Sequence, residues 1–418
     1  MHKSILSTAT FRQSQITVIG TLINGLLGLA FVVFLANYLG PANYGLFTVA
    51  TITMVLVADI ADIGTNTGLI RFVSKNLANN SDKAYKFLKL SLEIKLIAWI
   101  VSALVIFFLA SFLAAEVFHK EQLVQPLQLA GFGIGSALLF TFATSALQAY
   151  QKYFLWSLIN IISNTLRFLL ILALGYYLIL DLRSSLIVYI ALPFFGFFIT
   201  LFILPTRKII KSKNEFGLVK EFFQYNIPVA IFTMIAAFSA KLDTYLTGAL
   251  LSSKELGIYG LANQLVVFLP QLVSALGLVS SPKFASFQVN EQMLVYFKKF
   301  QLLASGLVVL GILTIPIITF IIPRILSEYQ EAVVPFTILF IAQLIFLFSI
   351  PVHHSVIFYF GRPDVFIGVS LGHLLLIGIL GYFMISNYGV VGASLTVLAG
   401  TTFNFLYPLI WLLIKLRK

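Results

Sequence analysis

The chain has 418 residues, of which 60% are apolar and only 10% are charged. An average soluble domain carries about 25% charged residues, so this composition excludes a water-exposed globular surface and indicates lipid as the solvent. Cysteine is absent, which excludes disulfides, thiol catalysis and cysteine-bound metals. A net charge of +12 can indicate nucleic-acid binding, but the distribution of the basic residues decides its meaning.

Apolar runs of about 20 residues, long enough to cross a hydrocarbon core of roughly 30 Å as a helix, recur along the sequence. They are continuously apolar rather than alternating, which favours helices over a β-barrel. We therefore expect an all-α polytopic membrane protein with about twelve transmembrane helices. In chain order, the expected spans are 16–38, 45–64, 92–115, 127–149, 154–180, 185–206, 226–250, 257–281, 301–323, 333–359, 365–386 and 389–414.

Lysine and arginine are distributed unevenly between the loops on the two sides of these spans. Of the 27 basic residues, 20 fall on one side, and only Lys120, Arg183, Lys254 and Arg324 fall on the other. The positive-inside rule places the first side, and with it both termini, in the cytoplasm. The sequence thus predicts a multi-pass protein of the cytoplasmic (inner) membrane. Its basic excess is a topology signal and a contact for anionic lipid headgroups, and no nucleic-acid partner is expected.

A polar stretch at residues 207–215 divides the sequence into two similar halves. Tyr44-Gly45-Leu46 matches Tyr259-Gly260-Leu261 at an offset of 215 residues, and the turn at 150–152 corresponds to 360–362 at an offset of 210. Each half has an even number of spans, so the halves should be parallel rather than inverted. We expect an N-terminal lobe (1–206), a basic cytoplasmic linker (207–225) and a C-terminal lobe (226–418), forming two six-helix lobes around a central cleft. Alternatively, these motifs are ordinary turns at helix ends.

The region of the first two spans contains a motif at their junction, Leu39-Gly40-Pro41-Ala42-Asn43-Tyr44-Gly45, then Asp62-Ile63-Gly64 at the end of the second span and, after six further residues, Arg71. This pattern resembles the polysaccharide transport family, the O-antigen and capsule repeat-unit flippases of the multidrug/oligosaccharidyl-lipid/polysaccharide exporter superfamily. The resemblance implies a carrier that moves undecaprenyl-pyrophosphate-linked oligosaccharide across the cytoplasmic membrane by alternating access. Its product would be a surface polysaccharide: the O-antigen of lipopolysaccharide, a capsule or an exopolysaccharide. The implied partners are the lipid-linked oligosaccharide, membrane lipids and the polysaccharide polymerase or chain-length machinery, without a cofactor.

Two other functions remain open beside this one. An ion-coupled multidrug exporter of the same superfamily is the main alternative, although the Gly-Pro-x-x-Tyr-Gly signature is not typical of drug extruders. An integral-membrane glycan ligase or polymerase is disfavoured because every predicted outer loop is short. Lipid II flippases of the superfamily typically have an Arg-Asp pair in the first span, which residues 16–38 lack, so a peptidoglycan precursor is also disfavoured.

Polar side chains inside the spans are the candidates for a substrate site, because an ionisable group at bilayer depth costs from about 2.5 to over 10 kcal/mol. Asn160, Asn164 and Arg167 follow one another at steps of four and three, so they share one face of the fifth span. We expect this face to line the cleft. The guanidinium of Arg167 suits a phosphate or an acidic sugar, and Arg167 is the first candidate for substrate binding.

Three further cleft candidates lie in the second half. Lys241 is expected to contact an anion, because on a regular helix it points about 200° away from Asp243 and cannot neutralise it. A local break in the helix, with a structural Lys241–Asp243 pair, is the alternative. Gln264 and Gln271 form a polar stripe that suits either sugar hydroxyls or interhelical hydrogen bonds.

The candidates for ion or proton coupling are Asp59, Asp62, Asp243 and His373. Asp59 and Asp62 lie one turn apart, and two like charges at this distance favour binding of a proton. Helix capping, or an ion-paired elbow with Arg71, is the competing interpretation. No metal-ligand, nucleotide-loop or nucleophile motif is present, so the sequence predicts a carrier without catalytic residues or a metal, not an enzyme.

Overall fold

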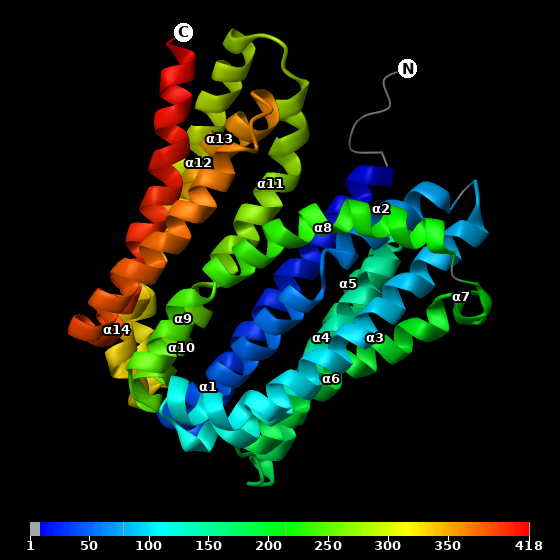
Figure 1. The fold of residues 1–418 in the computed structure, drawn as a ribbon. Coiled ribbons are helices and arrows are strands. Elements are labelled where there is room, and N and C mark those ends of the chain that lie inside the picture. The colour runs from blue at the N-terminus through cyan, green and yellow to red at the C-terminus, as the bar shows by residue number, and fades with distance from the viewer. Residues whose placement is uncertain (1–8, 78, 214, 418) are drawn as a thin grey trace. The chain divides into compact units, whose positions relative to one another are not determined.

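The computed structural model describes residues 9–77, 79–213 and 215–417, and every element in this part of the chain is a helix (Figure 1). The all-α, polytopic prediction is confirmed. The expected cytoplasmic termini and linker include residues 1–8, 214 and 418, which lie outside the described residues. The α-helices are α1 Ala9–Ala61, α2 Thr65–Asn76, α3 Ser81–Phe112, α4 Val124–Ala149, α5 Tyr153–Tyr176, α6 Leu182–Ile203, α7 Thr206–Lys211, α8 Phe216–Ser239, α9 Leu242–Leu250, α10 Ser253–Val266, α11 Phe268–Ser286, α12 Asn290–Ile325, α13 Val333–His354 and α14 Val365–Leu416. Shorter 3-10 and π turns are η2 Leu113–Val117, η3 Glu121–Leu123, η4 Ser327–Ala332 and η5 Ser355–Tyr359.

Two of the longest helices are bent at a glycine. Gly40 in α1 has φ 69° and ψ 167°, and Gly389 in α14 has φ 57° and ψ −133°. Both have positive φ, which costs a side-chain-bearing residue much more than glycine. Each bend coincides with an expected boundary between two spans, 38/45 and 386/389.

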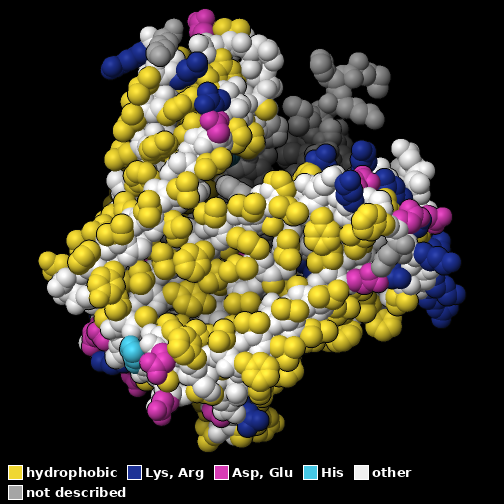
Figure 2. Space-filling model, viewed as in Figure 1, with side chains coloured by type: hydrophobic (Ala, Val, Ile, Leu, Met, Phe, Trp, Pro, Cys, Tyr) yellow, Lys and Arg dark blue, Asp and Glu magenta, His cyan; other side chains and the backbone are white. Residues whose placement is uncertain are grey.

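Nine helices in the described part of the chain are long and apolar enough to cross a membrane. Dividing α1 and α14 at their bent glycines raises this number to eleven. The expected span 257–281 is itself divided, between α10 and α11. The number of spans therefore agrees with the sequence prediction of about twelve. Hydrophobic side chains cover the visible flanks of the helices in Figure 2, as a lipid-facing surface requires.

The chain forms two compact units. Within the described residues, the first takes in the chain up to Leu39 together with Leu46–Phe238. Its helices α3, α4 and α6 run side by side, and small residues allow close approach, as where Gly131 of α4 faces Ala103 of α3. A buried aromatic cluster joins α2, α3 and α8, with the rings of Phe72 and Phe87 stacked at 4.6 Å and Phe222 beside them.

The second unit consists of Gly40–Gly45 and, within the described residues, the chain from Ser239 onward. Its helices α12, α13 and α14 pack along one another. Gly45 and Gly257 of α10 lie so close that an added side chain at either would meet backbone atoms. Helix α10 begins with a capping box, in which Ser252 Oγ accepts from Glu255 N at 3.3 Å and the Glu255 carboxylate accepts from Ser252 N at 3.0 Å. The expected division into two six-helix lobes stays a prediction.

Candidate functional site

The polar face of α5 lies inside the first unit. Asn164 Nδ2 donates to Asn24 Oδ1 of α1 at 2.9 Å, and Asn160 Nδ2 donates to the carbonyl oxygen of Trp156 at 2.8 Å. Gly20 of α1 lies directly against Ser157, so α1 and α5 approach closely on this side. The polar residues of this face are therefore positioned by contact between α1 and α5.

Arg167 continues this face and is held by aromatic rings. Its guanidinium carbon lies 4.5 Å from the ring centre of Tyr189 on α6 and 5.8 Å from that of Phe31 on α1. Within the part of the chain that the structure describes, Arg167 has no carboxylate partner, and its buried Nε has no hydrogen-bond partner. Cation–π contacts stabilise a guanidinium without neutralising it, so Arg167 keeps its positive charge.

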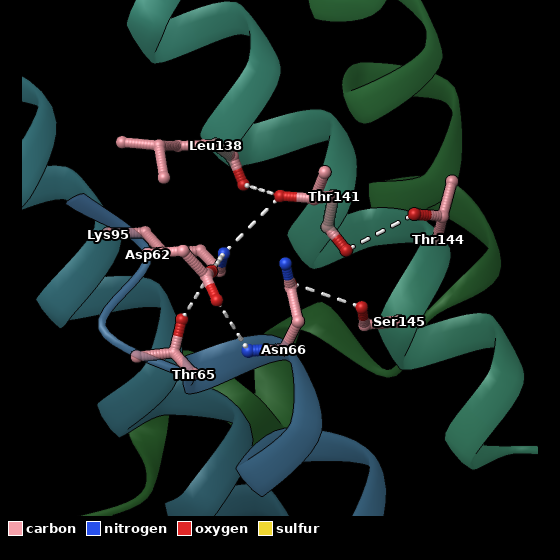
Figure 3. Close-up of polar contacts among 8 residues, drawn as sticks. All are labelled: Asp62, Thr65, Asn66, Lys95, Leu138, Thr141, Thr144 and Ser145. Atoms are coloured by element: carbon pink, nitrogen blue, oxygen red, sulfur yellow. Dashed lines mark hydrogen bonds and ion pairs between the residues drawn. The ribbon is translucent and has the colours of Figure 1, made fainter. Parts of the chain in front are cut away.

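A second polar cluster lies where α1 ends and α2 begins (Figure 3). Asp62 forms an ion pair with the fully buried Lys95 of α3. The carboxylate also accepts from Thr65 Oγ1 at 2.7 Å and from the backbone N of Asn66 at 3.2 Å, so it caps α2. Lys95 Nζ donates in addition to Thr141 Oγ1 of α4 at 3.3 Å.

This cluster contains two of the candidates for ion coupling. Asp59 is exposed and lies within electrostatic range of Lys95. Arg71, the partner considered for Asp62 from the sequence, instead places its guanidinium 4.3 Å from the ring centre of Tyr225 on α8. Asp62 thus both caps the start of α2 and forms a buried ion pair, in which the cation is Lys95 of α3.

In the second unit, Lys241 and Asp243 lie at a break in the helix. Helix α8 ends at Ser239 and α9 begins at Leu242, with Lys241 in a non-helical conformation between them. Asp243 is buried and accepts from the hydroxyl of Tyr259 on α10 and from Thr244 Oγ1 at 3.3 Å. Lys241 is half-buried and forms no ion pair with Asp243 within the described residues.

The remaining candidates also lie in the second unit. His373 of α14 is half-buried, and its Nδ1 lies 2.7 Å from Ser239 Oγ. Gln264 is exposed near the end of α10, and Gln271 is half-buried on α11. No group of three or more His, Cys, Asp or Glu side chains suitable for a metal occurs in the part of the chain described.

Several residues of these clusters were not singled out from the sequence. Lys95 is one of only two charged residues in the apolar run 92–115, the other being Glu93, and Asn24 is a polar residue in the apolar run 16–38, so each carried a signal. Tyr259 belongs to the repeated Tyr-Gly-Leu motif, which from the sequence is interpreted as part of an internal repeat or as a turn, not as a contact of Asp243. Tyr189 carried no signal that distinguishes it from the other 16 tyrosines.

Comparison with solved structures defines the fold. The chain is similar to lipid II flippase MurJ in an inward closed conformation, with a TM-score of 0.76 and 16% identity over 95% of this chain and 87% of that one. It is similar to an inward-facing multidrug resistance MATE family transporter of the MOP superfamily, with a TM-score of 0.71 and 13% identity over 95% and 97%. It is also similar to a MOP superfamily transporter from Pyrococcus furiosus that is described as having a binding pocket of reverse polarity. The TM-score is 0.61, and the identity is 12% over 96% of this chain and 93% of that one. The protein thus has the multi-pass helical fold of MOP superfamily transporters.

The family follows from the sequence match. Residues 11–288 match the family described as polysaccharide biosynthesis protein, and no curated protein matches the chain. Because the match covers more than half of the chain, the protein belongs to this polysaccharide biosynthesis family. The resemblance carried by the Gly-Pro-x-x-Tyr-Gly and Asp-x-Gly motifs is confirmed.

Proposed function

We propose that the protein is a flippase that moves a polyprenyl-diphosphate-linked oligosaccharide from the cytoplasmic to the outer leaflet for synthesis of a surface polysaccharide. The observation that supports this proposal best is the environment of Arg167. Its guanidinium is held by two aromatic rings, lacks a carboxylate partner in the described part of the chain and shares a face of α5 with two asparagines. Membership of a polysaccharide biosynthesis family and the fold of MOP superfamily transporters support it.

Each part of such a substrate has a counterpart in the candidate residues. The planar guanidinium of Arg167 would bind diphosphate oxygens through paired N–H donors, which a point-charge ammonium reproduces less well. Asn160 and Asn164 carry both donors and acceptors, which suit sugar hydroxyls. The polyprenyl tail would stay in the bilayer, so it need not pass through water. We propose alternating access as the mechanism, without cofactor or covalent chemistry.

The membrane potential would assist this transport. A diphosphate headgroup carries about two negative charges, and moving them outward from a negative interior is favourable by roughly 4 to 5 kcal/mol per 100 mV. Ion coupling would add to this, and Asp243 and His373 are the proposed sites. Lys241, Gln264 and Gln271 are proposed as further substrate contacts. For Asp62 we propose a structural role rather than ion coupling, because its carboxylate already pairs with Lys95 and accepts a hydrogen bond at the start of α2.

Substitutions of Arg167 test the proposal in a strain whose own gene is deleted and which is complemented with each variant. Arg167→Lys keeps the positive charge but loses the paired N–H donors of the guanidinium, whereas Arg167→Ala loses both. Glycan export should therefore fall in the order wild type, Arg167→Lys, Arg167→Ala. A hydrogen bond to a charged group contributes about 1.5 to 3 kcal/mol, so the Ala variant should export roughly 10- to 150-fold more slowly. Lipid-linked intermediates should accumulate on the inner leaflet.

Arg324→Ala is the matched control, because Arg324 is an exposed arginine that also lies on an aromatic ring, that of Phe320, outside the candidate site. It should export at the wild-type rate, and membrane abundance must be equal for all variants. Full export by a normally expressed Arg167→Ala variant would remove Arg167 from the substrate path. Transport of fluorescent organic cations by the wild type, with normal glycan export in the deletion strain, would instead identify a drug exporter.

A further inference from the structure

A cavity of about 640 Å³ lies in the first unit, at the corner where α6 ends and α7 begins. Its wall is apolar on the side of α6, with Phe198, Leu201 and Phe202, and continues through Pro205. Arg207 and Lys208 of α7 line the remaining side. One cavity therefore combines a long apolar wall with two cationic side chains.

The apolar wall belongs to a face of α6 that needs lipid. Phe195, Phe198 and Phe202 follow at helical steps of three and four, and they are 42%, 54% and 91% exposed. An aromatic face this open is unfavourable in water but matches the hydrocarbon region of a bilayer. The cavity therefore opens where an acyl chain would lie along α6.

The two basic residues are held at the edge of this apolar face by α7. Ile209 is 3% exposed and packs into the core of the first unit, whereas its neighbour Ile210 is 63% exposed. The buried Ile209 thereby fixes the short helix, and Arg207 and Lys208 precede it directly. Their charges are thus kept beside the end of a membrane-spanning helix, at the depth expected for lipid headgroups.

The two basic residues at this corner form no ion pair within residues 9–77, 79–213 and 215–417. Arg207 has no ion pair or side-chain hydrogen bond within residues 79–213 and 215–417, and Lys208 only places its Nζ 5.8 Å from the ring centre of Tyr85.

Among the described residues, the nearby lysines of α3, unlike Arg207 and Lys208, form ion pairs with carboxylates. Lys83 pairs with Glu221 at 3.1 Å, Lys86 with Glu215, and Lys89 with Glu93 at 3.7 Å. Figure 2 shows basic and acidic side chains mixed over the end of this unit where α2, α3 and α7 lie. Arg207 and Lys208 thus lack, in the described part of the chain, the carboxylate partners that these three lysines of α3 have.

We propose that this corner binds a phospholipid with an anionic headgroup, whose phosphate contacts Arg207 and Lys208 while an acyl chain lies along Phe198 and Phe202. Arginine forks match phosphate oxygens, and basic pockets beside membrane-spanning helices suit anionic headgroups. The net negative charge distinguishes this ligand from a zwitterionic lipid, which cannot compensate two cations. The proposal is independent of the transported substrate, since none of these residues belongs to the face of Arg167.

Native mass spectrometry of the full chain in detergent tests this site, with phosphatidylglycerol and phosphatidylcholine of identical acyl chains as probes. The variant Arg207→Gln/Lys208→Gln should bind phosphatidylglycerol about 25-fold more weakly, because each basic residue near the surface contributes roughly fivefold. The matched control Lys211→Gln/Lys213→Gln removes two charges from the same segment outside the cavity and should change binding less than about twofold. Arg167→Ala should bind this lipid like the wild type.

Four results would overturn the proposal. Equal losses in the two double variants would mean that a diffuse basic surface, rather than the cavity, attracts the lipid. Unchanged binding by Arg207→Gln/Lys208→Gln would exclude these residues as the headgroup contact. Equal affinity for phosphatidylcholine, or full displacement of the lipid by millimolar glycerol phosphate without acyl chains, would show that an anionic phospholipid is not the ligand.

Discussion

Removing one partner of the buried Lys95–Asp62 pair should destabilise the first unit, by an amount that depends on which partner is removed. Asp62→Asn leaves the ammonium of Lys95, which is 0% exposed, without its ion-pair partner and with neutral acceptors such as Thr141 Oγ1 at 3.3 Å. Lys95→Met leaves a carboxylate that still accepts from Thr65 Oγ1 and the N of Asn66. Breaking a buried pair typically costs 3 to 5 kcal/mol, so we expect about 5 kcal/mol for Asp62→Asn and about 3 kcal/mol for Lys95→Met.

The double variant Lys95→Met/Asp62→Asn removes both charges and should recover most of this loss, because an ion pair replaced by neutral groups is often close to neutral in stability. Hydrogen exchange at the amides of α3 and α4 measures the opening free energy of this unit. The cycle should give a coupling of at least about 3 kcal/mol between the two sites. If the two single losses simply add in the double variant, the buried pair does not stabilise this unit.

Three further predictions concern packing, capping and topology. In a thermal unfolding assay, Gly257→Ala should destabilise the second unit by about 1 to 3 kcal/mol, because the added Cβ would meet the carbonyl oxygen of Pro41. The control Gly306→Ala, which has open space around it, should be neutral or stabilising in the same assay. The backbone hydrogen bond from Ser184 lowers the pKa of Asp181. This cap therefore stabilises α6 fully above the unfolded-state pKa, and the stabilisation is lost as pH falls through the folded-state pKa. Asp181→Ala should cost about 1 kcal/mol of stability at pH 7, and this cost should vanish in acid. Reporter fusions should place Lys213 inside and Lys254 outside, and an external reading at Lys213 would contradict the topology.

The helices could be predicted from the sequence because lipid leaves the backbone few choices. A segment without water must satisfy its own hydrogen bonds, so an apolar run of sufficient length indicates a helix. The bends at Gly40 and Gly389 were also foreseeable as span boundaries. The break before Leu242 could be considered only as an alternative, because the sequence there, Phe238-Ser239-Ala240-Lys241, contains neither glycine nor proline.

The candidate site could be predicted only within one helix. The spacing of Asn160, Asn164 and Arg167 places them on one face of α5 by helical geometry alone. The rings that hold Arg167 come from α1 and α6, and the cation that pairs with Asp62 comes from α3, 33 residues further along the chain. Such contacts depend on how helices cross, which a single sequence does not determine.

The segment Gly40–Gly45 has a consequence for dividing this protein into fragments. It lies within the second unit, where Gly45 contacts the backbone of Ser253 and Gly257 that of Pro41, although it precedes most of the first unit in the chain. A fragment that ends at Phe238 would carry this turn away from the helices that enclose it, and would expose backbone that is now covered. The second unit is thus discontinuous in sequence, and a single cut after Phe238 assigns its segment Gly40–Gly45 to the fragment that holds the first unit.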